Sequence, residues 1–213
     1  SGRRFDDTLT NCRRCIGEVD ANGHAHVETQ CHVLQCCTFN KGLISKRHDN
    51  IAEAFHRMLL NLDIDAEWEI PVGEVTTRLR PDIIVRTKKH NYLIDIKAPY
   101  DEIENMNRAR LDNVGKYSDL ANDMRKTTKK GCSVETFIVG ALGSWDPANN
   151  DLLRKLTVSD AEQLNLAKLV TISSIKDSCY IYNRHRSTKS CQGIVMEQRR
   201  LEREEEEAAG LIG

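Results

Sequence analysis

The sequence contains no long apolar run. Within its 213 residues, hydrophobic residues never continue for the roughly 18 positions that a membrane-spanning helix requires. The chain also has no positively charged start followed by an apolar leader. We therefore expect neither a membrane span nor a secretory signal, and no membrane partner. The chain begins with Ser-Gly rather than Met, and we expect it to be a fragment of a longer protein.

The chain also lacks an excess of positive charge, which argues at first against a nucleic-acid partner. Its formal net charge is −1, but residues 197–207 hold six glutamates against three arginines, a net of −3. Subtracting this acidic segment from the total leaves +2 for the rest of the chain. We expect the segment to be a solvated helix or a frayed end. The other basic residues form clusters that are either phosphate contacts or ordinary solvated faces: Arg78 with Arg80, Lys88 with Lys89, Arg125 to Lys130, and Arg184 to Lys189.

Two apolar, β-branched runs each carry one aspartate where a buried strand usually carries none. Asp82 directly precedes the first run, and Asp95 lies inside the second, at 92–96. Side chains alternate between the faces of a strand, so Asp95 and Lys97 share one face. The short polar segment 86–91 between the runs is suited to a hairpin, which brings Asp82 beside Asp95. The sequence therefore predicts two carboxylates and an ammonium group at one point.

This combination of groups suits the hydrolysis of a phosphodiester. Mg²⁺ is usually held by one or two carboxylates, with waters and phosphate oxygens in its other positions. Asp82 and Asp95 supply such an incomplete ligand set for Mg²⁺ or Mn²⁺. Lys97 is suited to orient the attacking water or to offset charge in the transition state. The alternative is a surface hairpin whose aspartates face solvent, although carboxylates are rarely buried without a partner.

Five of the eight cysteines lie near the N-terminus, together with three histidines. The Cys12-x-x-Cys15 spacing lets two thiolates bind one tetrahedral Zn²⁺, and His32 with Cys36 or Cys37 would complete the site. Four protein ligands make a closed, structural site, and the metal would supply much of the folding energy of so short a segment. The alternative is a set of reduced, half-buried cysteines.

The hydrophobic pattern of the remaining chain predicts an α/β sandwich. The order is helix, three strands, helix, strand and further helices, which is typical of a mixed sheet flanked by helices. The expected helices are 49–62, 101–124, 149–156 and 160–174, and the expected strands are 67–75, the two aspartate-bearing runs and 133–141.

Several short motifs occur in a specific order: Cys12-x-x-Cys15, Glu28-Thr29-x-x-His32-Val33-Leu34-x-x-Cys37, Arg47-His48-Asp49-Asn50, Arg80-Pro81-Asp82, Asp95 and Lys116-Tyr117. In this order they resemble the C-terminal restriction-like endonuclease domain of site-specific non-LTR retrotransposons, over residues 10–175. The resemblance implies a PD-(D/E)xK nuclease core preceded by a small CCHC zinc knuckle. We accordingly expect the knuckle within 1–45, the nuclease core at 46–180, and a basic loop with a charged helical tail at 181–213.

The resemblance also implies which residues hold the metals. Asp82 and Asp95 become the ligands of Mg²⁺, and Glu53 matches the first-helix glutamate of the wider nuclease superfamily, unless it is only a surface residue. The zinc site takes His32 and Cys37 as its second pair, which leaves Cys36 outside. The implied zinc ligands are therefore Cys12, Cys15, His32 and Cys37.

The same resemblance points to residues that contact nucleic acid. Arg47 and His48 match a basic motif that either binds DNA phosphate or supports the active site. His48 is equally suited to cap or pack the helix that follows. Arg80 and Lys116 are further candidates for contact with DNA, and Lys116 with Tyr117 is expected beside the scissile phosphate.

The chain differs from many members of the family that it resembles at the position of the catalytic lysine. Those relatives carry it one helical turn before the tyrosine, where this chain has Asn113. Either Lys97 or Lys116 must then be the catalytic lysine. Lys97 shares a strand face with Asp95, and we therefore favour it.

We expect a Mg²⁺-dependent endonuclease that nicks one strand of double-stranded or branched target DNA. The resemblance implies that the new 3′-hydroxyl primes reverse transcription of the element RNA by an adjacent reverse transcriptase domain, in the nucleus. Two alternatives stay open. One is a catalytically inactive, zinc-containing nucleic-acid-binding module, which the Asn113 departure favours. The other is a zinc-stabilised scaffold for protein partners, which charges buried in apolar strands disfavour.

Overall fold

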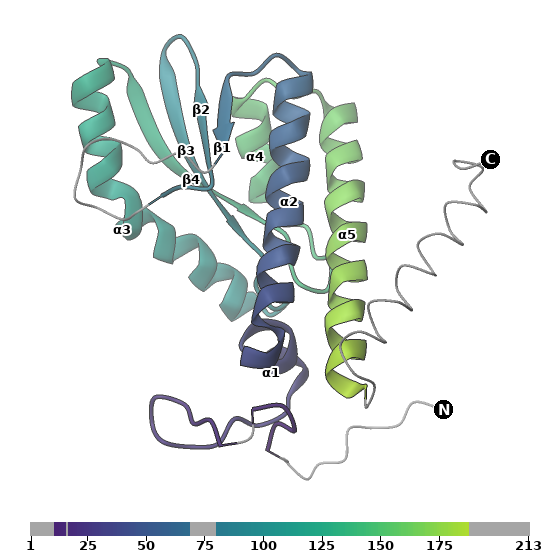
Figure 1. The fold of residues 1–213 in the computed structure, drawn as a ribbon. Coiled ribbons are helices and arrows are strands. Elements are labelled where there is room, and N and C mark those ends of the chain that lie inside the picture. The colour runs from purple at the N-terminus through teal and green to yellow at the C-terminus, as the bar shows by residue number, and fades with distance from the viewer. Residues whose placement is uncertain (1–10, 16, 69–79, 188–213) are drawn as a thin grey trace, which may run out of the picture.

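The computed structural model describes residues 11–15, 17–68 and 80–187, without the side chains of Asn113 and Val114. Most of the expected strand 67–75 and the whole acidic segment 197–207 lie outside this part. The described elements (Figure 1) are α1 (Gln30–Gln35), a 3₁₀ turn (Thr38–Asn40), α2 (Lys41–Asn61), β1 (Ala66–Trp68), β2 (Ile83–Arg86), β3 (His90–Lys97), α3 (Ile103–Thr128), β4 (Gly131–Ile138), α4 (Ala148–Lys155) and α5 (Asp160–Arg186).

The four strands form one mixed sheet in the order β1-β2-β3-β4. β1 pairs with β2 and β2 with β3 in antiparallel fashion, whereas β3 and β4 are parallel. The expected hairpin is present, because β2 and β3 pair as far as Arg86 and Asn91 and three residues, 87–89, connect the two strands. A parallel pair needs a crossover connection, and α3 supplies it between β3 and β4. The prediction of an α/β fold with a mixed sheet flanked by helices is confirmed.

Helices cover both faces of this sheet (Figure 1). Ile94 of β3 packs into a core that residues of α2, α4 and α5 complete. Its neighbour Leu93 faces the other way and packs against Tyr117 of α3. Strand alternation places Asp95 and Lys97 on the same side as Leu93. The apolar residues of β3 thus separate two cores, and its charged residues lie toward α3.

Two helices, α2 and α5, are much longer than the sequence predicted. α2 begins at Lys41, directly after the 3₁₀ turn, and α5 continues to Arg186. The start of α5 is where we expect it, because Ser159 and Glu162 form a capping box. Its extension is stabilised by buried residues that recur as far as His185. The boundary expected at residue 180 therefore falls inside α5.

None of the described helices is both long enough and apolar enough to span a membrane.

Candidate functional site

Asp82 lies at the entrance to β2, beside the end of β3. Ile83 pairs with Ile94, so the next position along each strand brings Asp82 opposite Asp95. Oδ2 of Asp82 accepts a hydrogen bond of 2.6 Å from the backbone N–H of Ile96. Asp82 is thereby fixed to the backbone next to Asp95, as the hairpin prediction requires.

Asp95 is the centre of a buried polar cluster on the α3 side of the sheet. Its residue surface is 2% exposed. Lys97 forms an ion pair with Oδ2, the ammonium of Lys116 lies 3.4 Å from Oδ1, and the Tyr117 hydroxyl donates to Oδ1 over 2.7 Å. Burial alone would raise the pKa of Asp95, but the hydrogen bonds from Lys97 and Tyr117 and both lysine charges hold it below its ordinary value. Asp95 is therefore a carboxylate at neutral pH.

Tyr117 connects α3 to this cluster. Its side chain is fully buried, and its hydroxyl oxygen lies 2.7 Å from both Oδ1 of Asp95 and the carbonyl oxygen of Arg80. One hydroxyl proton therefore faces two acceptors. Burial and the neighbouring Asp95 raise the pKa of Tyr117, so the hydroxyl stays protonated. The ammonium of Lys116 lies 4.5 Å from the centre of the Tyr117 ring, a cation–π contact that holds this lysine beside Asp95.

His48 of α2 links Asp82 to β3. Its Nε2 lies 3.3 Å from Oδ2 of Asp82 and 3.2 Å from the carbonyl oxygen of Ile96, and its Nδ1 lies 3.1 Å from Oδ1 of Asp49. The hydrogen bond to Asp82 raises the pKa of His48 to about 9, against the effect of burial, and Asp49 acts in the same direction. His48 is therefore a cation at neutral pH that orients Asp82.

Arg47 is placed where a phosphate contact is not available. Its side chain is 0% exposed. The guanidinium donates to Ser178 Oγ over 2.8 Å, to the carbonyl of Leu34 over 3.0 Å and to that of Ala98 over 3.4 Å. Burial lowers the pKa of Arg47 to about 10, so it keeps its charge at neutral pH. Of the two expected roles, contact with DNA phosphate does not fit this position, and the described partners of Arg47 belong to the framework and not to the aspartate cluster.

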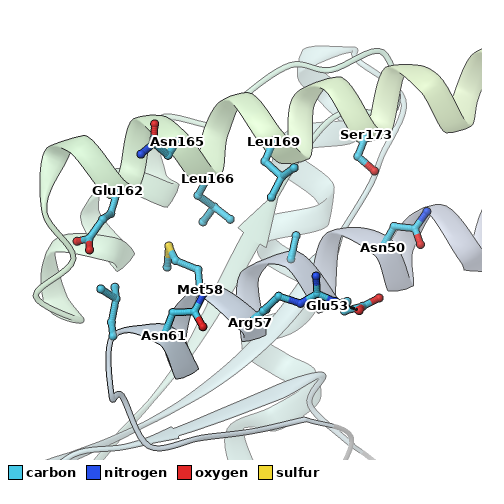
Figure 2. A pocket seen from close by; sticks show the side chains of 12 residues that line it. Asn50, Glu53, Arg57, Met58, Asn61, Glu162, Asn165, Leu166, Leu169 and Ser173 are labelled. Atoms are coloured by element: carbon cyan, nitrogen blue, oxygen red, sulfur yellow. Dashed lines mark hydrogen bonds and ion pairs between the residues drawn. The ribbon is translucent and has the colours of Figure 1, made fainter. Parts of the chain in front are cut away.

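The structure does not bring Glu53 to the aspartate cluster. Glu53 is exposed on α2 and pairs with Arg57 one helical turn later. Figure 2 shows both side chains in a groove between α2 and α5, where Leu169 of α5 also lies. Arg80 is exposed next to Asp82 and contributes its backbone carbonyl to Tyr117. Glu53 therefore has no part in the site proposed below, whereas Arg80 borders it.

The fit of the aspartate cluster to Mg²⁺ or Mn²⁺ depends on its two carboxylates. Both ions prefer carboxylate oxygens, and the site offers two aspartates on adjacent strands. Oδ2 of Asp95 is buried and forms the ion pair with Lys97. The two carboxylates are the type of ligand that a hard divalent ion prefers.

A second cluster lies in the N-terminal segment and brings together the four expected zinc ligands. The ligand atoms of Cys12, Cys15, His32 and Cys37 all lie within 4.8 Å of one another, and all four residues are buried. Cys15 Sγ lies 3.5 Å from Nε2 of His32 and 3.6 Å from Sγ of Cys37. Tetrahedral zinc with Zn–S bonds of about 2.3 Å separates its sulfurs by about 3.8 Å. This Cys₃His cluster is therefore compatible with zinc.

The local sequence explains how these four ligands meet. The N–H of Cys12 donates to the carbonyl of His26, which pins the first ligand to the strand-like segment before α1. Thr29 caps α1 and accepts from the N–H of His32, so His32 lies in the first turn of that helix. The N–H of Cys37 then donates to the carbonyl of His32 just after α1 ends. Cys36 is exposed, so the alternative between Cys36 and Cys37 is decided for Cys37.

His185 of α5 belongs to the surroundings of the same cluster, and the sequence did not indicate it. Its ring is fully buried, 3.8 Å from Sγ of Cys12 and 3.6 Å from Sγ of Cys37. Glu28, expected only as part of a motif, lies 3.2 Å from Nε2 of His185. A distance of 148 residues along the chain separates His185 from Cys37, so no local spacing could have revealed the contact.

No protein-family model matches this sequence, and no curated protein matches it.

Proposed function

We propose that this chain is a Mg²⁺-dependent endonuclease that hydrolyses one strand of DNA. The main support for the proposal is the cluster of polar side chains around Asp95. Two lysines and a tyrosine from β3 and α3 surround its buried carboxylate, and Asp82 is fixed to the adjacent N–H of Ile96. The helix–strand order and the mixed sheet are compatible with the PD-(D/E)xK core that the motifs resemble.

Each residue of the cluster has a role in this proposal. Asp82 and Asp95 would hold the metal, which supplies Lewis-acid polarisation of the scissile phosphate and activation of water. Attack of water on phosphorus breaks the bond to the 3′ oxygen and leaves a 5′-phosphate and a 3′-hydroxyl. Lys97 and Lys116 offset the negative charge that develops on the phosphate oxygens. Tyr117 keeps the Asp95 carboxylate oriented through its hydrogen bond.

The charge balance of the cluster favours a phosphate ligand. Asp82, Asp95 and Asp49 carry three negative charges, and Lys97, Lys116 and protonated His48 carry three positive charges. A divalent cation alone gives this balanced cluster a positive excess, and a DNA phosphate relieves it. We therefore propose that Mg²⁺ binds weakly to the free protein and more tightly once DNA is present.

Lys97 is the proposed catalytic lysine. It lies on the same strand as Asp95 and forms its ion pair with Oδ2 of that residue. Lys116 lies 3.4 Å from the other oxygen and is held over the Tyr117 ring, which suits contact with a neighbouring phosphate. Asn113 lies in α3, but the structure does not describe its side chain. The choice of the catalytic lysine therefore depends on the positions of Lys97 and Lys116.

A plasmid-nicking assay tests the proposal. With Mg²⁺ or Mn²⁺ the chain should convert supercoiled DNA to the open circle, and Asp82→Asn, Asp95→Asn and Lys97→Ala should each lower the rate at least about 100-fold. Lys116→Ala should lower it less. Glu53→Gln is the matched control, because it neutralises an exposed carboxylate outside the cluster. Failure of the wild-type chain to cut even branched or pre-melted DNA would reject the proposal.

The inactive nucleic-acid-binding module is the second candidate. It is favoured by the ion pair between Lys97 and Asp95, because an ammonium that neutralises Asp95 substitutes for the metal ion. The two proposals differ in two outcomes, DNA binding and nicking. An inactive module binds DNA with an affinity that does not depend on Mg²⁺ and never nicks it, whereas the nuclease does both in a Mg²⁺-dependent way. In either case the resemblance to retrotransposon domains supports element RNA and an adjacent reverse transcriptase domain as partners, in the nucleus.

A further inference from the structure

The ring of His185 lies against the sulfur atoms of the Cys₃His cluster without being one of its four ligand groups. Nε2 lies 3.8 Å from Cys12 Sγ, and Nδ1 lies 3.6 Å from Cys37 Sγ. These two cysteines come from the two halves of the cluster, before and after α1. A single side chain from the far end of the chain therefore contacts both halves.

Both ring nitrogens of His185 have further partners that fix its orientation. Oε2 of Glu28 lies 3.2 Å from Nε2, and the amide nitrogen of Asn40 lies 3.3 Å from Nδ1. Glu28 is itself held by the backbone N–H and the side chain of Arg13, each 2.9 Å from Oε2. Asn40 is fully buried and donates to the carbonyl of Val33. The imidazole is thus locked between a carboxylate and an amide that both belong to the N-terminal segment.

The end of α5 is bound to the same segment through its backbone. The last carbonyls of a helix have no partner within the helix. Arg14, which lies between Cys12 and Cys15, donates from Nε to the carbonyl of His185 over 3.0 Å and also donates to the carbonyl of Ser187. Arg14 therefore caps the helix that delivers His185. Figure 1 shows this end of α5 next to α1 and the N-terminal segment.

We propose that His185, oriented by Glu28, is a positioning residue for the metal of the Cys₃His cluster and fastens that cluster to the α/β core. Groups that hydrogen-bond to metal ligands fix their orientation and contribute to metal affinity. The inference rests on zinc binding by the cluster and does not depend on the nuclease proposal.

An alternative use of the same residues is a second metal site. The ligand atoms of Cys12, Glu28 and His185 also lie within 4.8 Å of one another. However, both carboxylate oxygens of Glu28 are already paired with Arg13, and Cys12 belongs to the four-ligand cluster. The network therefore orders the zinc ligands and does not hold a second ion.

Zinc affinity, measured by competition with a chromophoric chelator on the full chain, tests the proposal. His185→Ala should weaken zinc binding 10- to 100-fold, about the usual effect of removing such a partner. Glu28→Gln should weaken it in the same direction. His24→Ala is the matched control and should change nothing, because His24 is an exposed histidine of the same segment. Wild-type affinity in both His185→Ala and Glu28→Gln overturns the proposal. If His185→Ala yields no folded protein, Glu28→Gln decides in the same way.

Two further measurements test whether His185 connects the Cys₃His cluster to the α/β core or instead binds a second metal ion. Removal of zinc should increase amide hydrogen exchange at residues 178–186 in the wild-type chain. Unchanged exchange there overturns the fastening role. The wild-type chain should bind one zinc ion. If the wild-type chain binds two zinc ions and His185→Ala binds one, His185 is a ligand of a second site, and the proposal is overturned. If the wild-type chain binds no zinc, the proposal is overturned as well.

Discussion

The Tyr117 hydroxyl donates a 2.7 Å hydrogen bond to Oδ1 of Asp95 inside the protein. This contact joins α3 to β3 at the point where the two lysines also meet the carboxylate. The same hydroxyl lies 2.7 Å from the carbonyl oxygen of Arg80, so it also fixes the chain that leads to Asp82. One tyrosine therefore holds together the three segments from which the candidate site is built.

Tyr117→Phe should destabilise the fold by about 2 kcal/mol, because the buried Asp95 carboxylate loses a hydrogen-bond donor. Denaturation by urea provides the measurement. Tyr100→Phe is the matched control: its hydroxyl donates to Gln30 at an exposed position, and the expected change is below about 0.5 kcal/mol. Equal effects in the two variants would contradict the role given to Tyr117.

Asp82→Asn should lower the pKa of His48 in the absence of divalent ions. The hydrogen bond to Asp82 is the largest cause that raises this pKa to about 9 from 6.5. NMR titration of the ring gives the measurement, and Glu53→Gln should leave it unchanged. Because the folded-state pKa is raised, the stabilisation from protonated His48 is complete below about pH 6.5 and is lost as the pH rises through about 9. A His48 pKa that does not respond to Asp82→Asn would contradict the contact.

Arg47→Met should cost about 2–3 kcal/mol of stability, because the buried Ser178 hydroxyl and the Leu34 carbonyl lose the guanidinium that donates to them. Arg57→Met, at an exposed position on the same helix, should cost less than about 0.5 kcal/mol. The folded Arg47→Met protein should bind DNA with wild-type affinity. Unchanged stability together with loss of DNA affinity would instead show that Arg47 contacts phosphate.

Cys37→Ser should abolish stoichiometric zinc binding, and Cys36→Ser should preserve it. Cys37 is buried in the Cys₃His cluster, whereas Cys36 is exposed. Burial raises the pKa of Cys37 to about 12, so zinc must displace a proton from this thiol, and the apparent affinity should increase with pH. Metal analysis of the two purified variants gives the measurement. Zinc retained in Cys37→Ser would contradict the ligand assignment.

The sequence predicted the features that depend on local patterns. Strand alternation placed Asp95 and Lys97 on one face, and the short loop before Asn91 predicted the hairpin that carries Asp82. The Cys12-x-x-Cys15 spacing and the motif around His32 predicted the Cys₃His cluster. In each case neighbouring residues determine the geometry, because turns, strands and short helices are set by local sequence.

The features that the sequence missed depend on distant contacts. Nothing near Arg47 indicates burial, because its acceptors Leu34, Ala98 and Ser178 come from three other parts of the chain. His185 likewise has no local signal, since its partners lie at the opposite end of the chain. Long-range packing decides whether a basic residue faces DNA or the interior, and residue type and spacing carry little information about it.

The most direct test of the central claim is the nicking of supercoiled plasmid by the zinc-loaded chain, with and without added Mg²⁺, for the wild type and Asp95→Asn. The proposal predicts that open circles accumulate only for the wild type with Mg²⁺, while both proteins keep their zinc and their fold. Equal nicking by Asp95→Asn, or no nicking by the wild type on supercoiled, branched and pre-melted DNA, would contradict it.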